Sequence, residues 1–122
     1  MGPVNWIAVV VAWLVAALIG VAFYGRRALP GVPLSTHVLA AVVLFVSMAM
    51  VGHMFARVGP ATLADKPWLY FMMSGGLALT FIGPALIVTG ARRERPLGEA
   101  MFDWGYFLVA FLAAGAVFWL MG

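Results

Sequence analysis

Two histidines, His37 and His53, are the side chains best suited to ligate a metal ion or a haem. Both fall in one apolar stretch, and the sixteen residues from one to the other correspond on a helix to about 24 Å of rise and about 160° of rotation. They cannot share one ion, so no metal site is predicted. A single imidazole can still be an axial ligand to a haem or a chlorophyll-type pigment. His53 is the candidate for that role because Gly52 leaves space beside it, and the preferred alternative is an interfacial, hydrogen-bonding histidine.

The acidic residues all fall in predicted loops or at predicted helix ends: Asp65, Glu94, Glu99 and Asp103. Asp103 belongs to the first turn of the last predicted helix, where a carboxylate complements the helix dipole and can pair with a nearby arginine. The alternative is that it contacts a polar headgroup or a substrate. Asp103 and His37 are the polar residues expected near one membrane interface, and they form the acid–base pair of a third-ranked hypothesis, an enzyme acting on lipid.

Other catalytic patterns are missing from the sequence. There is no cysteine, and we find no serine nucleophile motif, HExxH motif or phosphate-binding loop. No ionisable residue falls near the middle of an apolar stretch, which argues against ion-coupled transport by a single copy. We therefore expect a protein that is not an enzyme.

The elements that carry these residues must lie in a membrane. Hydrophobic residues make up 66% of the 122 residues and charged residues only 9%, whereas about a quarter of a soluble domain is charged. The bilayer is the solvent in which so much apolar surface is stable. The net charge of +3 arises in short loops between apolar stretches, which favours a topology signal over a nucleic-acid partner.

Four apolar stretches are long enough to cross about 30 Å of hydrocarbon as helices: residues 4–24, 34–56, 68–90 and 100–121. Valine and isoleucine are frequent, but in lipid each segment must satisfy its own backbone hydrogen bonds, which favours helices over strands. The short linkers make neighbouring helices antiparallel. We predict an all-α, integral membrane four-helix bundle with up-down-up-down topology, and residues 1–122 as a single transmembrane domain.

The basic residues predict the orientation. One side of the bundle holds five of the seven, Arg26, Arg27, Arg92, Arg93 and Arg95, and the other side holds Arg57 and Lys66. Cytoplasmic loops carry the excess of Lys and Arg. Loops 25–33 and 91–99 are therefore predicted to be cytoplasmic and both termini periplasmic, in a multi-pass protein of the bacterial inner membrane.

Small residues predict where the helices approach one another, because membrane helices associate through close packing rather than burial from water. The first helix carries Ala8, Ala12, Ala16 and Gly20 at a spacing of four. The third and fourth helices are also rich in small residues: Ser74, Gly75, Gly76, Ala78 and Gly83, then Ala110, Ala113, Ala114 and Gly115. Gly76 and Gly83 are the packing residues predicted for the third helix. Packing within the chain is the preferred interpretation, and docking on a partner is the alternative. Pro84 is predicted to kink the third helix, with Ser74, Thr80 or a neighbouring helix bonding to the carbonyl that the proline frees.

Both ends of the chain resemble a known family. The segment N-W-I-A-V-V-V-A-W-L from Asn5, and R-P-L-G-E-A-M-F-D-W-G-Y from Arg95, are similar to the first and last helices of the bacterial membrane family called domain of unknown function 1761. Phe107 stands where the family often has histidine, and residues 26–31 differ from its usual segment after the first helix. The resemblance implies a four-helix membrane fold and no known activity.

These observations favour a non-catalytic accessory subunit of a larger membrane complex, which packs through small-residue helix faces and aids assembly or stability. The alternative is a small oligomeric transporter or channel. The expected partners are membrane lipid and other membrane protein subunits. The sequence requires no cofactor, and haem or a chlorophyll-type pigment at His53 is the cofactor that it would allow.

Overall fold

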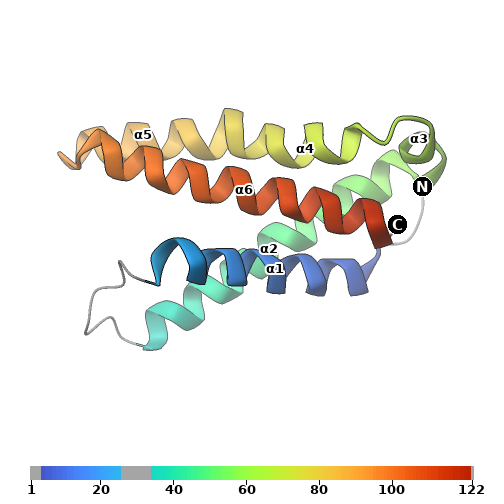
Figure 1. Cartoon of the computed structure of the whole chain (residues 1–122), viewed down its shortest axis with the longest axis horizontal. Coiled ribbons are helices and arrows are strands. Elements are labelled where there is room, and N and C mark those ends of the chain that lie inside the picture. The colour runs from blue at the N-terminus through green and yellow to red at the C-terminus, as the bar shows by residue number, and fades with distance from the viewer. Residues whose placement is uncertain (1–3, 26–33, 122) are drawn as a thin grey trace.

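The computed structural model describes residues 4–25 and 34–121. They form helices and no strand (Figure 1): α1 (Trp6–Tyr24), α2 (Leu34–Val58), α3 (Pro60–Asp65), α4 (Leu69–Leu77), a π-helical turn η1 (Ala78–Ile82), α5 (Gly83–Arg92) and α6 (Leu97–Met121). Four spans are long and apolar enough to cross a membrane, namely α1, α2, the continuous α4–η1–α5 and α6. The all-α four-helix architecture is therefore confirmed, and the chain is a multi-pass membrane protein.

The predicted boundaries need small corrections. Helix α6 begins at Leu97, three residues before the predicted start, because Pro96 immediately precedes it and a helix can begin directly after a proline. The predicted linker between the second and third spans contains α3, which starts with Pro60 after Gly59 turns the chain at φ 94°. Loop 25–33 lies outside the described residues, apart from Gly25.

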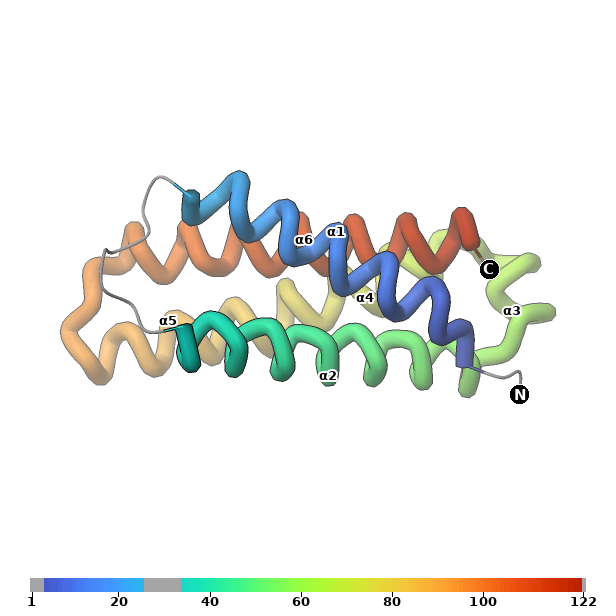
Figure 2. The backbone as a smooth tube through the Cα atoms, turned by 90° about the horizontal axis from the view of Figure 1, so that it is seen from below, coloured from blue at the N-terminus to red at the C-terminus, as the bar shows by residue number. Residues whose placement is uncertain are grey.

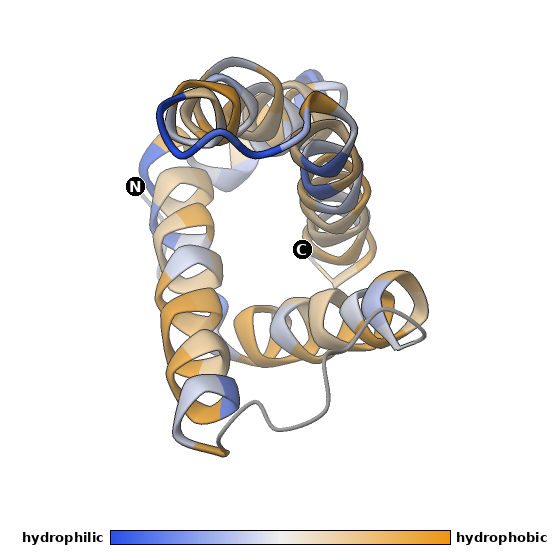
Figure 3. Ribbon diagram, turned by 90° about the vertical axis from the view of Figure 1, so that its left-hand side faces the viewer, coloured by the Kyte–Doolittle hydropathy of each residue, from blue (hydrophilic) through white to orange (hydrophobic). Residues whose placement is uncertain are grey.

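The spans alternate in direction and α6 is central to their packing. Figures 1 and 2 show α1 and α6 side by side, with α4 and α5 continuing one another along the other side of α6. Figure 3 looks along the helices and shows hydrophobic residues all around each span, with hydrophilic residues gathered at the helix ends. The protein thus offers lipid an apolar surface and keeps its charges near the two interfaces.

Aromatic and polar contacts fix the end of the bundle near α3. Phe55 of α2 packs against Tyr70 of α4 and Phe118 of α6, with ring centroids 4.9 and 5.2 Å apart. Asn5 caps α1 by accepting from the Ala8 amide at 3.1 Å, and its side-chain amide donates to the Met121 carbonyl at 3.0 Å. The start of α1 is thereby tied to the end of α6.

Pro84 is accommodated by a π-helical turn. A proline has no N–H, so one carbonyl of the preceding turn loses its partner. In η1 the hydrogen bonds widen instead, and the Gly83 amide donates to the Ala78 carbonyl. The Thr80 hydroxyl donates to the Gly76 carbonyl at 2.6 Å, and the Ser74 hydroxyl donates to the Tyr70 carbonyl at 2.7 Å. Neither hydroxyl therefore makes the predicted bond to the carbonyl that Pro84 frees. Figure 1 shows α4 and α5 continuing one another along one line, without the predicted kink.

Candidate functional site

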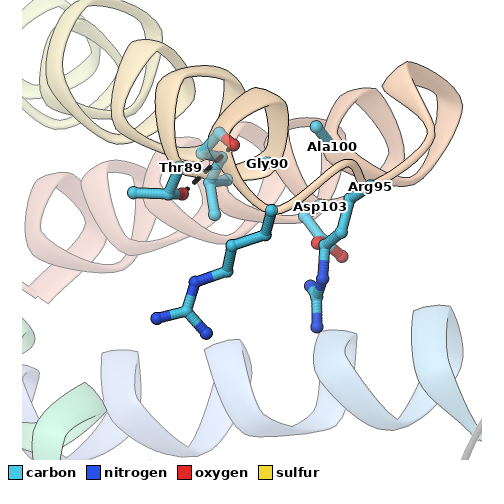
Figure 4. A pocket seen from close by; sticks show the side chains of 7 residues that line it. Thr89, Gly90, Arg95, Ala100 and Asp103 are labelled. Atoms are coloured by element: carbon cyan, nitrogen blue, oxygen red, sulfur yellow. Dashed lines mark hydrogen bonds between the residues drawn. The ribbon is translucent and has the colours of Figure 1, made fainter.

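A polar cavity of about 320 Å³ lies between the end of α5 and the start of α6 (Figure 4). Its lining combines two arginines, a carboxylate, a hydroxyl and small or apolar groups: Leu86, Thr89, Gly90, Arg93, Arg95, Ala100 and Asp103. We call this cavity the arginine pocket. It is the candidate site because charged side chains from the α5–α6 turn and from α6 converge there.

The turn that ends α5 positions the two arginines. The Arg95 amide donates to the Gly90 carbonyl at 2.8 Å and the Glu94 amide to the Ala91 carbonyl at 3.3 Å. With Glu94 at φ 56°, this is a Schellman C-cap, whose penultimate position takes a left-handed conformation. Arg93 and Arg95 flank the reversal at Glu94 and both line the cavity, and Figure 4 shows Arg95 beside Asp103.

Asp103 is held from the opposite side by α1. Its carboxylate is half-buried and accepts a hydrogen bond of 2.5 Å from the Tyr24 hydroxyl. The Tyr24 ring packs edge-on against Phe102 and Tyr106, with centroids 5.5 and 5.3 Å apart. Three spans therefore meet at the arginine pocket. Among the described residues no ion pair joins Asp103 to an arginine, so the predicted pairing is replaced by the phenol contact.

The other candidate catalytic residues are not brought together in the part of the chain that the structure describes. His37 is exposed at the start of α2 and does not line the arginine pocket, so the proposed acid–base pair with Asp103 is not brought together. No three His, Asp or Glu side chains gather closely enough in residues 4–25 and 34–121 to hold a metal ion. A lipid-directed acid–base mechanism therefore gains no support from the geometry.

His53 lies on the exposed side of α2, near Trp6. Its Nδ1 is 2.7 Å from the Ala49 carbonyl, and its ring meets the Trp6 ring edge-on at a centroid distance of 5.6 Å. A carbonyl accepts only, so Nδ1 carries the proton in the neutral ring and Nε2 is left with its lone pair. This is the atom that would ligate a haem or pigment approaching from the lipid.

The predicted packing residues of α1 face the interior of the bundle. Ala8, Ala12 and Ala16 are fully buried. A Cβ at Gly20 would lie 3.3 Å from the Tyr106 hydroxyl, which donates to the Ala16 carbonyl at 3.0 Å. We call Ala8, Ala12, Ala16 and Gly20 the α1 stripe. It packs against α6, so a partner protein cannot dock on it unless the bundle opens.

The two predicted glycines of the third span differ from each other. Gly83 is buried, and a Cβ there would overlap the Trp104 ring of α6. Gly76 is not a packing residue, because nothing would lie within 4 Å of its Cβ. The contact belongs to its neighbour Gly75, whose Cβ would approach Leu112 to 2.6 Å. Of these two adjacent small residues only Gly75 makes a contact, because one position on a helix is a rotation of about 100°. The prediction of Gly76 as a packing residue was therefore wrong.

Sequence reasoning missed Thr89, Tyr24 and the first half of α2. Every residue from 34 to 40 is exposed, and the buried residues of α2 start at Met48. A helix that packs along its whole length buries one residue in every three or four. Residues 34–40 of α2 therefore have no buried face. Tyr24 and Asp103 could have been paired from the sequence, since both lie near the same predicted interface.

Comparisons with known proteins give no relative. No family model matches the chain, and neither a curated protein nor a solved structure matches it. The resemblance to domain of unknown function 1761 stays a prediction.

Proposed function

We propose that this protein is a non-catalytic accessory subunit of a larger complex in the bacterial inner membrane. The observation that supports this proposal is the first half of α2, where residues 34–40 are all exposed, whereas the second half of the helix has buried residues from Met48 on. Along this half one side carries small or β-branched side chains at helical spacing: Thr36, Ala40, Val43 and Ser47. We call these four residues the α2 face.

Small side chains let a second transmembrane helix approach closely, and close approach is what holds membrane helices together. The α2 face is suited to this contact, and the α1 stripe is already occupied by α6. The Trp13 indole N–H donates to the Ala41 carbonyl at 3.0 Å, which keeps this half of α2 attached to α1. A partner helix would thus meet a surface held in place by its own chain.

The test is native purification in mild detergent, followed by mass spectrometry and an absorption spectrum of the intact particle. We expect the chain to travel with a larger complex at fixed stoichiometry. A paired substitution, Ala40→Leu with Ser47→Leu, should remove it from the complex. The matched control is Ala17→Leu, on the exposed side of α1, which should leave association unchanged.

A chain that runs alone or only with copies of itself would contradict the accessory role. A pigment band that disappears in His53→Ala would establish the axial-ligand role of His53.

A small oligomeric transporter or channel is the second candidate. The π-helical turn η1 followed by Pro84 in the third span favours it, because such turns often occur at functional sites of helices. This candidate predicts flux through liposomes that contain the purified chain alone. Flux equal to that of empty liposomes would reject it.

A further inference from the structure

We propose that the arginine pocket binds the headgroup of a membrane phospholipid that carries both a phosphate and a hydrogen-bond donor, as phosphatidylethanolamine and phosphatidylglycerol do. The pocket offers two cationic side chains, Arg93 and Arg95, and one carboxylate, Asp103. This set complements a phosphodiester with an ammonium or hydroxyl group a short distance away. The inference concerns the chain itself and holds with or without a partner protein.

The arginines would bind the phosphate. Guanidinium groups bind phosphate oxygens with paired, charge-assisted hydrogen bonds. Arg93 and Arg95 flank the Schellman turn at Glu94 and line the same cavity, so both can reach one ligand. The Thr89 hydroxyl lies in the same wall and already donates to the Ala85 carbonyl at 2.8 Å, which leaves its oxygen as an acceptor.

Asp103 would select for a donor on the headgroup. An ionised carboxylate accepts about four hydrogen bonds, and Tyr24 supplies one of them. A phosphate alone would be repelled by this carboxylate, whereas an ammonium or hydroxyl group beside the phosphate would satisfy it. Phosphatidylcholine has the phosphate but its quaternary ammonium has no N–H to donate.

The location favours a lipid over a soluble phosphate compound. The pocket lies at the ends of two spans, where lipid headgroups meet the protein, and basic pockets between transmembrane helices are known binding places for such headgroups. Leu86 and Ala100 add apolar groups to its lining. Its volume of about 320 Å³ is at the small end of the ~300–1,000 Å³ typical of ligand pockets and suits a headgroup alone.

The experiment measures lipid binding to the purified, delipidated full chain by native mass spectrometry. Phosphatidylethanolamine, phosphatidylglycerol and phosphatidylcholine with identical acyl chains are titrated separately. We expect the first two to bind about tenfold more tightly than phosphatidylcholine, as one charge-assisted hydrogen bond would give. Equal binding of all three lipids would overturn the proposal.

Variants locate the site. Arg93→Gln with Arg95→Gln should weaken binding of both donor-bearing lipids by tenfold or more. The single variants Arg93→Gln and Arg95→Gln should each weaken binding as well. The control Arg92→Gln removes one positive charge, as each single variant does, from an adjacent exposed residue that does not line the pocket, and it should change binding little. An equal loss in the control would show surface attraction only and would overturn the proposal.

Asp103→Asn separates recognition from folding, because the amide oxygen can still accept from Tyr24. This variant should weaken the binding of phosphatidylethanolamine relative to that of phosphatidylglycerol. The ammonium group of phosphatidylethanolamine loses the negative charge that it pairs with, whereas the anionic phosphatidylglycerol is no longer repelled by the Asp103 carboxylate. An unchanged ratio of the two affinities would overturn the assigned role of Asp103.

A competition experiment distinguishes a lipid from a soluble phosphate compound. Glycerophosphoethanolamine, the headgroup without acyl chains, should not displace phosphatidylethanolamine at equal concentration. Equal competition would mean that the site binds a soluble phosphate compound instead.

Discussion

Gly83 and Gly76 show how much a single position matters inside this membrane protein. Both belong to the same apolar span, yet only Gly83 touches another helix, through the Trp104 ring of α6. The Trp104 indole N–H is buried and has no hydrogen-bond partner among the described residues. The Trp104 ring is therefore held by packing against Gly83, and it fits there because glycine has no side chain.

We expect Gly83→Ala to destabilise the protein by about 1–3 kcal/mol, because the added methyl group would overlap the Trp104 ring and force it to move. The matched control is Gly76→Ala, which places the same methyl group in open space and should be neutral or slightly stabilising. Thermal unfolding in detergent, followed by circular dichroism, measures both. Equal melting temperatures for the two variants would contradict the packing seen at Gly83.

At the scale of the helix, α1 has one face for the protein and the rest for lipid. Ala8, Ala12 and Ala16 are buried against the bundle, while Leu14 and Leu18 on the same helix are 50% and 68% exposed. Helix α2 changes along its length instead: residues 34–40 are all exposed, and its buried residues start at Met48. The two helices therefore have different uses: α1 builds the bundle, and the first half of α2 is available for contact.

Ala12→Leu should destabilise the chain itself by about 1–3 kcal/mol or more, since it adds a bulky side chain at a fully buried contact. Ala17→Leu makes the same change on the exposed side of α1 and should have little effect. The readouts are the melting temperature and the fraction of protein that elutes without aggregation. If Ala12→Leu left stability unchanged and released a partner protein, the α1 stripe would be an external docking face after all.

At the scale of the whole molecule, charge is concentrated at one end. The turn between α5 and α6 carries three arginines, Arg92, Arg93 and Arg95, whereas the opposite end has Arg57 and Lys66. The excess of basic residues predicts that the α5–α6 turn is cytoplasmic. The arginine pocket would then face the cytoplasmic leaflet, whose anionic lipids attract basic segments.

The absence of cysteine makes this orientation simple to test, because each engineered cysteine is the only thiol in the chain. Ala64→Cys in α3 and Glu94→Cys in the α5–α6 turn are both at exposed positions. A membrane-impermeant maleimide added to intact spheroplasts should label the first variant and label the second only after the membrane is permeabilised. The reverse pattern would invert the predicted topology.

Sequence alone determined that this protein lies in a membrane, that it is all-α and that it has four spans. Those properties depend on local composition, on helix length and on breakers such as Pro60, Pro67 and Pro96, and the observed helices begin and end within a few residues of the prediction. The candidate polar residue Asp103 was also found from its type and position.

Only the tertiary structure decided which faces of the helices meet. It placed Gly75 rather than Gly76 in a contact, joined Tyr24 to Asp103, and left residues 34–40 of α2 without a buried face. The physical reason is the bilayer itself. Lipid tails are as apolar as the side chains of a neighbouring helix, so hydropathy does not distinguish a lipid-facing residue from a packed one. The rotation of each helix about its axis follows from the fit of side chains across several spans, which no single stretch of sequence contains.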